Sequence, residues 1–166
     1  MTKRAKQRKV QNKKFSKGKM IIGLGAAAAI ISIIAYFGIN SLIPVNGTTP
    51  IFAPPRNTFI KATHSPQSGF VFTSQSTSGS KRSLPIGFNS PTLTFKKGGL
   101  ESIHLINEDG DSRSKHNLNI DEFNVHTRDL GYFESQTITF IANKDGTFKY
   151  YCTIHPEMMG TVIVEG

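Results

Sequence analysis

The sequence has one cysteine, no tryptophan, no acidic side chain in its first 19 residues and no internal repeat. A single cysteine, Cys152, excludes an intramolecular disulfide. Outside the first 45 residues, Gly, Pro, Ser, Thr and Asn are common and no long apolar-periodic segment occurs, which argues against a helix bundle. The remaining class is a fold of short strands joined by turns.

The positive charge of the chain is concentrated at its start. Nine of the 20 Lys and Arg residues lie between Lys3 and Lys19, whereas the chain from residue 20 onward has 11 basic and 11 acidic side chains. The formal net charge of +9 therefore belongs to a short tail, residues 1–19, and the rest of the chain is neutral. We expect no nucleic-acid partner.

A 20-residue run without a charged side chain, Met20 to Ile39, follows this tail. A helix of that length spans about 30 Å, the thickness of the hydrocarbon core of a bilayer. The pattern predicts a transmembrane anchor over residues 20–43 in the cell membrane, with residues 1–19 on the cytoplasmic side and the remainder outside. A cleaved signal peptide is the alternative, although no small-x-small cleavage site lies at the right place.

The remainder of the chain divides into a spacer and a folded domain. Residues 44–57 contain four prolines, which predicts a semi-rigid linker. Residues 58–166 predict an all-β domain, a β-sandwich of seven or eight strands. The predicted strands are 58–63, 70–74, 92–95, 100–107, 116–123, 137–142, 147–151 and 161–164, with a loop at 76–90 and a hairpin turn at 143–146.

Three potential metal ligands lie within seven residues near the end of the chain: Cys152, His155 and Met158. Thiolate, imidazole and thioether form a soft ligand set, which favours copper over calcium, magnesium or manganese. Zinc is disfavoured because a thioether is a weak ligand for it. Met158 is favoured over Met159 by its spacing from Cys152, and Glu157 is the alternative if neither methionine binds.

A trigonal copper site with one Cys, two His and a weak axial Met needs a second histidine. The candidates are His64, His104, His116 and His126. His116 is favoured because it follows a turn-rich stretch and starts a predicted strand, at one end of the sandwich. We expect the neighbouring Asn117 to hydrogen-bond across to the Cys152 segment and hold the two ligand stretches together.

The run from Tyr150 to Met158 resembles the ligand loop of cupredoxins, the type 1 blue-copper proteins, and is most similar to amicyanin-like and plastocyanin-like members with Cys-x-x-His-Pro-x-Met. Shorter stretches at 95–98, 107–109 and 116–117 resemble the approach to the family's first histidine ligand, and the strand after His116 is similar to archaeal membrane-tethered members. The resemblance implies a Greek-key β-sandwich, one copper ion cycling between Cu(I) and Cu(II), and electron transfer between redox partner proteins. It implies His116, Cys152, His155 and Met158 as the copper ligands.

The predicted function is therefore that of a membrane-tethered electron carrier and not an enzyme, because four protein ligands leave a catalytic metal no open position. A copper-trafficking protein is the alternative, although the chain lacks the Cys pairs and Met-rich tracts of such proteins. A nucleophilic Cys152–His155 pair leaves Met158 without a role. The lone cysteine also excludes a binuclear copper centre bridged by two cysteines.

Overall fold

The computed structural model describes residues 17–74 and 90–166. The chain forms two compact units, residues 1–39 and residues 40–166, which are described separately below. Most of the predicted basic tail and most of the predicted loop at 76–90 lie outside the described residues.

Helix α1 spans Lys17–Asn40 and covers the apolar run. The helix predicted from the sequence is thus present. Among the described residues, however, no helix is long and apolar enough to cross a membrane. The predicted transmembrane anchor over residues 20–43 is therefore not supported.

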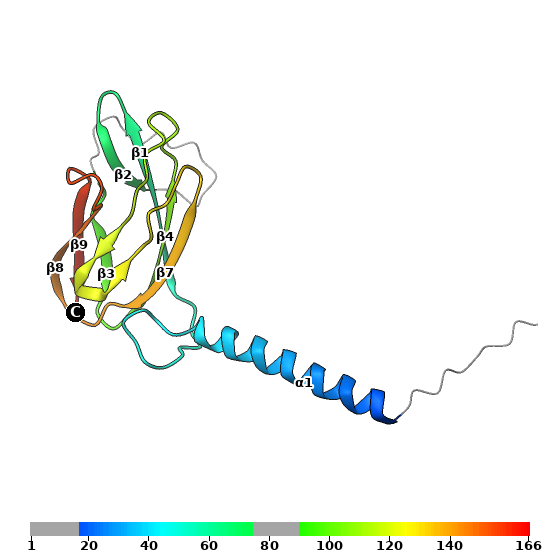
Figure 1. Ribbon diagram of the computed structural model, residues 1–166. Helices are drawn as coiled ribbons and strands as arrows, with labels where there is room; N and C mark the ends of the chain where they lie inside the picture. The colour runs from blue at the N-terminus through cyan, green and yellow to red at the C-terminus, as the bar shows by residue number, and fades with distance from the viewer. Residues whose placement is uncertain (1–16, 75–89) are drawn as a thin grey trace, which may run out of the picture. The chain divides into compact units, whose positions relative to one another are not determined.

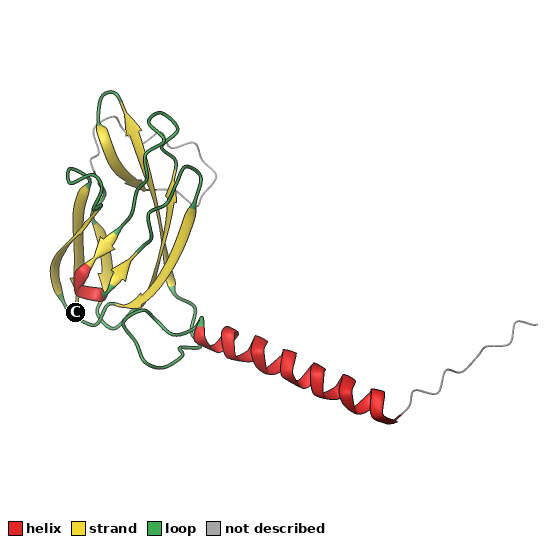
Figure 2. Ribbon diagram, in the orientation of Figure 1, coloured by secondary structure: helices red, strands yellow, loops and turns green. Residues whose placement is uncertain are grey.

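The second unit contains two β-sheets that face each other (Figure 1, Figure 2). One sheet has the strand order β2-β1-β4-β7, with β1 and β4 parallel. Its strands are β1 (Arg56–Ser65), β2 (Gly69–Ser74), β4 (Leu100–Asn107) and β7 (Ser135–Ile141).

The other sheet has the order β3-β9-β8-β5-β6, with β3 and β9 parallel. Its strands are β3 (Leu93–Lys96), β5 (Asn119–Ile120), β6 (Val125–His126), β8 (Gly146–Tyr151) and β9 (Met159–Glu165). A single 3-10 turn, η1 (Asp121–Phe123), joins β5 to β6.

The hydrophobic core lies between the two sheets. In β3, for example, Leu93 and Phe95 are buried while Thr94 and Lys96 are exposed, as the period of two in a strand requires. The core continues to the end of the sandwich, where Cys152 and Met158 belong to the same buried cluster as Phe72. Side chains at that end are therefore held by the packing of the core.

The predicted all-β sandwich is confirmed, with nine strands among the described residues instead of seven or eight. The single strand predicted over 116–123 is wrong. His116 makes an isolated bridge with Leu130, strand β5 covers two residues, and the 3-10 turn then ends at Phe123 and is followed by Asn124, whose φ is 54°. The left-handed backbone at Asn124 turns the chain back, and this is why β6 follows immediately.

The turn at 143–146 does not form the predicted hairpin. Strand β7 pairs with β4 in one sheet, whereas β8 pairs with β9 and β5 in the other. The turn therefore carries the chain from one layer to the other. Residue types and the turn signal at 143–146 identified both strands, but they contain no information about which strands pair.

The proline-rich stretch predicted as a linker belongs to the folded unit. Val45 N–H donates to Thr139 O at 2.9 Å. The Asn46 side chain then pairs with the backbone of Ile141: Oδ1 accepts from its N–H at 2.8 Å, and Nδ2 donates to its carbonyl at 2.7 Å. Because β7 is the last strand of its sheet, Asn46 acts as a one-residue partner for an open edge.

Three connections meet at one end of the sandwich (Figure 1). They are the turn between β1 and β2, the loop after β4, and the connection from β8 to β9. The last two contain the predicted metal ligands, so the topology brings segments about 40 residues apart to the same end of the sandwich.

Candidate metal centre

The connection from β8 to β9 is a short loop closed by its own backbone. Cys152 N–H donates to Met158 O at 3.0 Å, and Met158 N–H donates to His155 O at 2.9 Å. Cys152 comes directly after β8 and is buried, whereas His155 lies half-buried at the surface. The loop therefore presents a thiol from the core side and an imidazole from the solvent side.

His116 is held by a pair of backbone hydrogen bonds with Leu130, of 3.0 and 2.8 Å. Its ring is fully buried. Nε2 lies 3.1 Å from Asp109 Oδ2, but Nδ1 has no hydrogen-bond partner among the described residues. A buried nitrogen without a partner is costly unless something outside the chain binds it.

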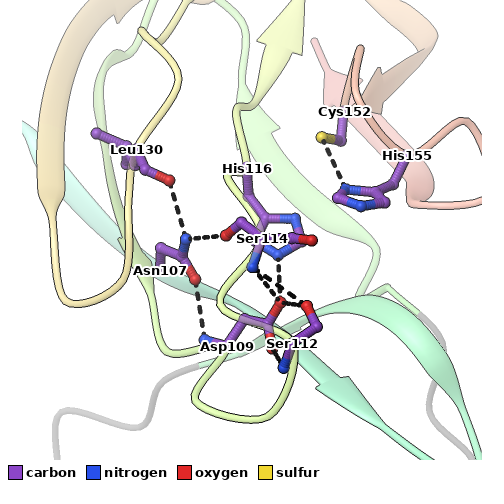
Figure 3. A network of polar contacts seen from close by, with 8 residues as sticks. All are labelled: Asn107, Asp109, Ser112, Ser114, His116, Leu130, Cys152 and His155. Atoms are coloured by element: carbon purple, nitrogen blue, oxygen red, sulfur yellow. Dashed lines mark hydrogen bonds and ion pairs between the residues drawn. The ribbon is translucent and has the colours of Figure 1, made fainter.

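The structure brings His116, Cys152 and His155 together. One ligand atom from each lies within 4.8 Å of the other two, and Cys152 Sγ is 4.0 Å from His155 Nδ1 (Figure 3). One thiol and two imidazoles are the trigonal set that suits copper. The free Nδ1 of His116 completes the fit, because a ligand nitrogen must keep its lone pair for the metal.

The two adjacent methionines differ in burial. Met158 is completely buried and belongs to the core cluster with Cys152, whereas Met159 is 56% exposed. Glu157 is also exposed. A thioether buried in the same cluster as the thiol could serve as a further ligand, so the burial favours Met158 over both alternatives.

The other three histidines have different surroundings. His104 stacks on Phe59 at 4.4 Å and hydrogen-bonds to Asn57, and His126 hydrogen-bonds to Asn119. His64 packs against Phe70 at 4.6 Å. Within the described part of the chain, the metal-ligand cluster contains His116 and His155 and none of these three.

Asn117 links the two ligand segments, as predicted. Its Oδ1 accepts from Thr153 N–H at 2.8 Å, and its Nδ2 donates to Thr153 Oγ1 at 2.6 Å. The same amide also bonds to Asn119 and Asp129. All four hydrogen-bonding positions of the amide are used, so the residue after His116 is fixed to the residue after Cys152.

Phe70 is part of the site and was missed in the sequence. It lies near the start of β2, and its ring lies tilted against that of His155, with 3.8 Å between ring centroids and 31° between planes. The half-buried ring limits how far the imidazole of His155 can turn. The sequence places Phe70 in a strand, but nothing in it indicates that the β1–β2 turn lies at the ligand end.

Asp109 was also missed as a site residue. Burial alone would raise the pKa of Asp109, but hydrogen bonds from Ser112, the Ser114 N–H and His116 lower it to about 2. Burial lowers the pKa of His116, with the nearby His155 acting in the same direction and Asp109 against it. Both effects favour a neutral imidazole beside an ionised carboxylate.

No family model matches the sequence, and no curated protein matches it. Among solved structures, similarity is found to a copper nitrite reductase from Nitrosomonas europaea, with 17% identity over 68% of this chain and 42% of that chain and a TM-score of 0.49. A reduced Cu(I) form of an amicyanin mutant gives 20% identity over 69% and 86%, with a TM-score of 0.38. A reduced auracyanin from Roseiflexus castenholzii gives 17% over 68% and 100%, with a TM-score of 0.45.

This chain spans less than half of the length of the nitrite reductase. All three TM-scores lie below 0.5, so the case for a metal centre depends on the geometry of His116, Cys152 and His155 in this chain.

Proposed function

We propose that this protein carries single electrons on one copper ion held by His116, Cys152, His155 and Met158. The observation that supports the proposal is the convergence of one thiol and two imidazoles within 4.8 Å, with a buried His116 Nδ1 that has no other partner among the residues the structure describes. When bound, copper supplies the Cu(I)/Cu(II) couple.

The protein's contribution is a rigid set of ligands. Cys152 and Met158 are packed into the core, His116 is bridged to Leu130, and Phe70 packs against His155. Electron transfer is fast when the ligands move little between the two oxidation states, and this arrangement restricts their movement. Four side chains around one ion also leave no open coordination position, which favours a carrier over an enzyme.

Redox partners are expected to dock where the site approaches the surface. His155 is half-buried, and its neighbours Ile154, Pro156 and Met159 are exposed and apolar. A small apolar contact suits brief encounters. The location of the domain outside the cytoplasm stays a proposal, because it depends only on the order of basic tail and apolar run in the sequence.

The experiment is to load the full chain with Cu(II) and record its visible spectrum and its redox cycling. We expect an intense thiolate-to-copper band that disappears on reduction and returns on oxidation. Cys152→Ser should abolish the band, and Met158→Leu should keep the copper but shift the potential. His104→Ala is the matched control, since His104 lies outside the cluster and should leave the band unchanged.

Two outcomes contradict the proposal. The first is copper uptake that is equally strong after Cys152→Ser and His116→Ala are combined. The second is a colourless protein that binds only Cu(I), which favours the alternative function in copper trafficking.

A further inference from the structure

The Asp109 carboxylate is completely buried and contacts the ring of His116 on the side away from Cys152 and His155 (Figure 3). It accepts hydrogen bonds from the backbone N–H groups of Ser112 at 2.9 Å and Ser114 at 3.2 Å, and from the Ser112 hydroxyl. His116 Nε2 is its fourth contact, at 3.1 Å. Several donors thus converge on one buried carboxylate.

The loop that contains Asp109 is itself held in place. Asn107 Oδ1 accepts from the Asp109 N–H at 2.9 Å. Asn107 Nδ2 donates to Ser114 O at 2.8 Å and to Leu130 O at 2.9 Å, and Leu130 is the residue bridged to His116 (Figure 3). The polar stretch 110–115 before His116 is therefore folded around the carboxylate and supplies its donors.

The contact between Asp109 and His116 determines which nitrogen of the imidazole carries the proton. An ionised carboxylate can only accept hydrogen bonds, so Nε2 must carry the proton in the Asp109–His116 pair. A neutral imidazole has one N–H, which leaves the lone pair on Nδ1. This Nδ1 is buried and has no hydrogen-bond partner in the described part of the chain. The carboxylate thus presents the ligand nitrogen in the form that a metal requires.

We propose that Asp109 is a positioning residue that fixes His116 with its proton on Nε2 and lowers the reduction potential of the copper site. The effect on the reduction potential rests on the proposed function, whereas the position of the proton on Nε2 does not. A buried negative charge on the far side of the ligand stabilises Cu(II) more than Cu(I), because the oxidised site carries one more positive charge. Little solvent reaches the pair to screen this effect.

The first test needs no metal. Nitrogen-15 NMR of the full, metal-free chain should show His116 protonated on Nε2. Asp109→Leu removes the acceptor, and the proton should then distribute over both ring nitrogens. Asp111→Asn is the matched control, because Asp111 is an exposed acid of the same loop and should not change the spectrum. An unchanged His116 signal in Asp109→Leu contradicts the proposal.

Asp109→Leu leaves several donors unpaired and could prevent folding. Ser112→Ala is the second variant, since it removes one donor to the carboxylate and keeps the carboxylate itself. We expect the proton to stay on Nε2 in this variant, because the acceptor is retained. If His116 carries its proton on Nδ1 in the wild-type chain, or if the proton redistributes in a folded Ser112→Ala protein, the first part of the proposal is wrong.

The second test measures the reduction potential of the copper-loaded chain. Asp109→Asn should favour Cu(I) over Cu(II) by about tenfold, which for one electron is a rise of about 59 mV. Asp111→Asn removes the same formal charge at the surface and should shift the potential much less. An equal shift in both variants, or no rise in Asp109→Asn, contradicts the second part.

The two failures can be told apart. If the wild-type chain takes up no copper, the proposed function and the effect on the potential fail together. The NMR result on the metal-free chain still decides whether Asp109 fixes His116.

Discussion

Cys152 and Met158 belong both to the hydrophobic core and to the proposed metal centre, so the packing of the core holds two of the proposed ligands in place. Their burial in the common cluster means that the loop 152–158 cannot shift without disturbing the packing between the sheets. Next to this loop, Gly160 and Tyr150 form a cross-strand pair between β9 and β8. The Tyr150 ring is fully buried and its hydroxyl donates to Pro91 O at 2.6 Å.

Gly160→Ala should destabilise the domain by about 2 kcal/mol through overpacking. A Cβ added at Gly160 would lie 2.3 Å from Tyr150 Cζ, and the tyrosine is fully buried with its hydroxyl bonded to Pro91 O. Chemical denaturation of the metal-free protein measures the free energy of unfolding. Gly131→Ala is the control, because a Cβ there would meet its nearest atom at an ordinary 3.7 Å. Equal stability of the two variants contradicts this prediction.

The carboxyl group of Glu101 should make the stability of the domain depend on pH. Burial raises the pKa of the Glu101 carboxyl, against smaller opposing effects of the Arg56 charge and a backbone hydrogen bond at Lys96. Its Oε2 has no partner among the described residues. The folded protein therefore binds this proton more tightly than the unfolded chain does.

The contribution of Glu101 to stability is fully present below the ordinary carboxyl pKa and is lost as the pH rises through the raised pKa. Glu101→Gln cannot lose a proton, so the loss of stability in this pH window should become smaller. Denaturation between pH 4 and pH 7 checks the result. An identical pH profile for the variant would show that Glu101 has the same pKa in both states.

At the scale of secondary-structure elements, the two ligand segments are joined by one amide, that of Asn117. Asn117→Ala should destabilise the domain by about 3 kcal/mol, because it removes four hydrogen bonds and leaves the Thr153 N–H without its partner. We also expect a broader range of Cys152 conformations, measurable by NMR relaxation. Asn143→Ala, an exposed amide at the β7–β8 turn, is the control and should have little effect.

The edge of β7 gives a second prediction at this scale. Asn46→Ala should increase hydrogen exchange at the Ile141 amide and cost about 1 kcal/mol, since Asn46 Oδ1 is the acceptor for that N–H. Thr48→Ala keeps the Asn46 amide and should leave the exchange rate unchanged. Protection that persists in Asn46→Ala would mean that another group covers the edge strand.

The elements also show what the sequence could predict. Strand β4 matches its predicted range, because local alternation is sufficient to identify a strand between two turns. The ligand loop was identified by its residue types and spacing alone. Pairing between strands, the packing of Asn46 on β7 and the inward position of Asp109 depend on contacts between distant residues. Glu108, Asp109 and Asp111 look equivalent in the sequence, and only the fold buries Asp109 completely.

For the whole molecule, every proposed ligand lies in the unit formed by residues 40–166. Copper that binds only the folded state stabilises it by mass action, by about 4 kcal/mol at a free concentration of 1,000 times Kd. For a domain of this size, we expect the melting temperature to rise by roughly 10 °C or more.

The comparison of four samples decides whether this stabilisation comes from the proposed centre. The full chain and a chain of residues 40–166 should gain the same increase in melting temperature with copper, because all four proposed ligands lie within residues 40–166. In both forms, Cys152→Ser should remove most of the gain, since the thiolate is the strongest ligand of the set. If the increase requires residues 1–39, or survives the loss of Cys152, copper binds elsewhere. In that case the buried Nδ1 of His116 needs another explanation.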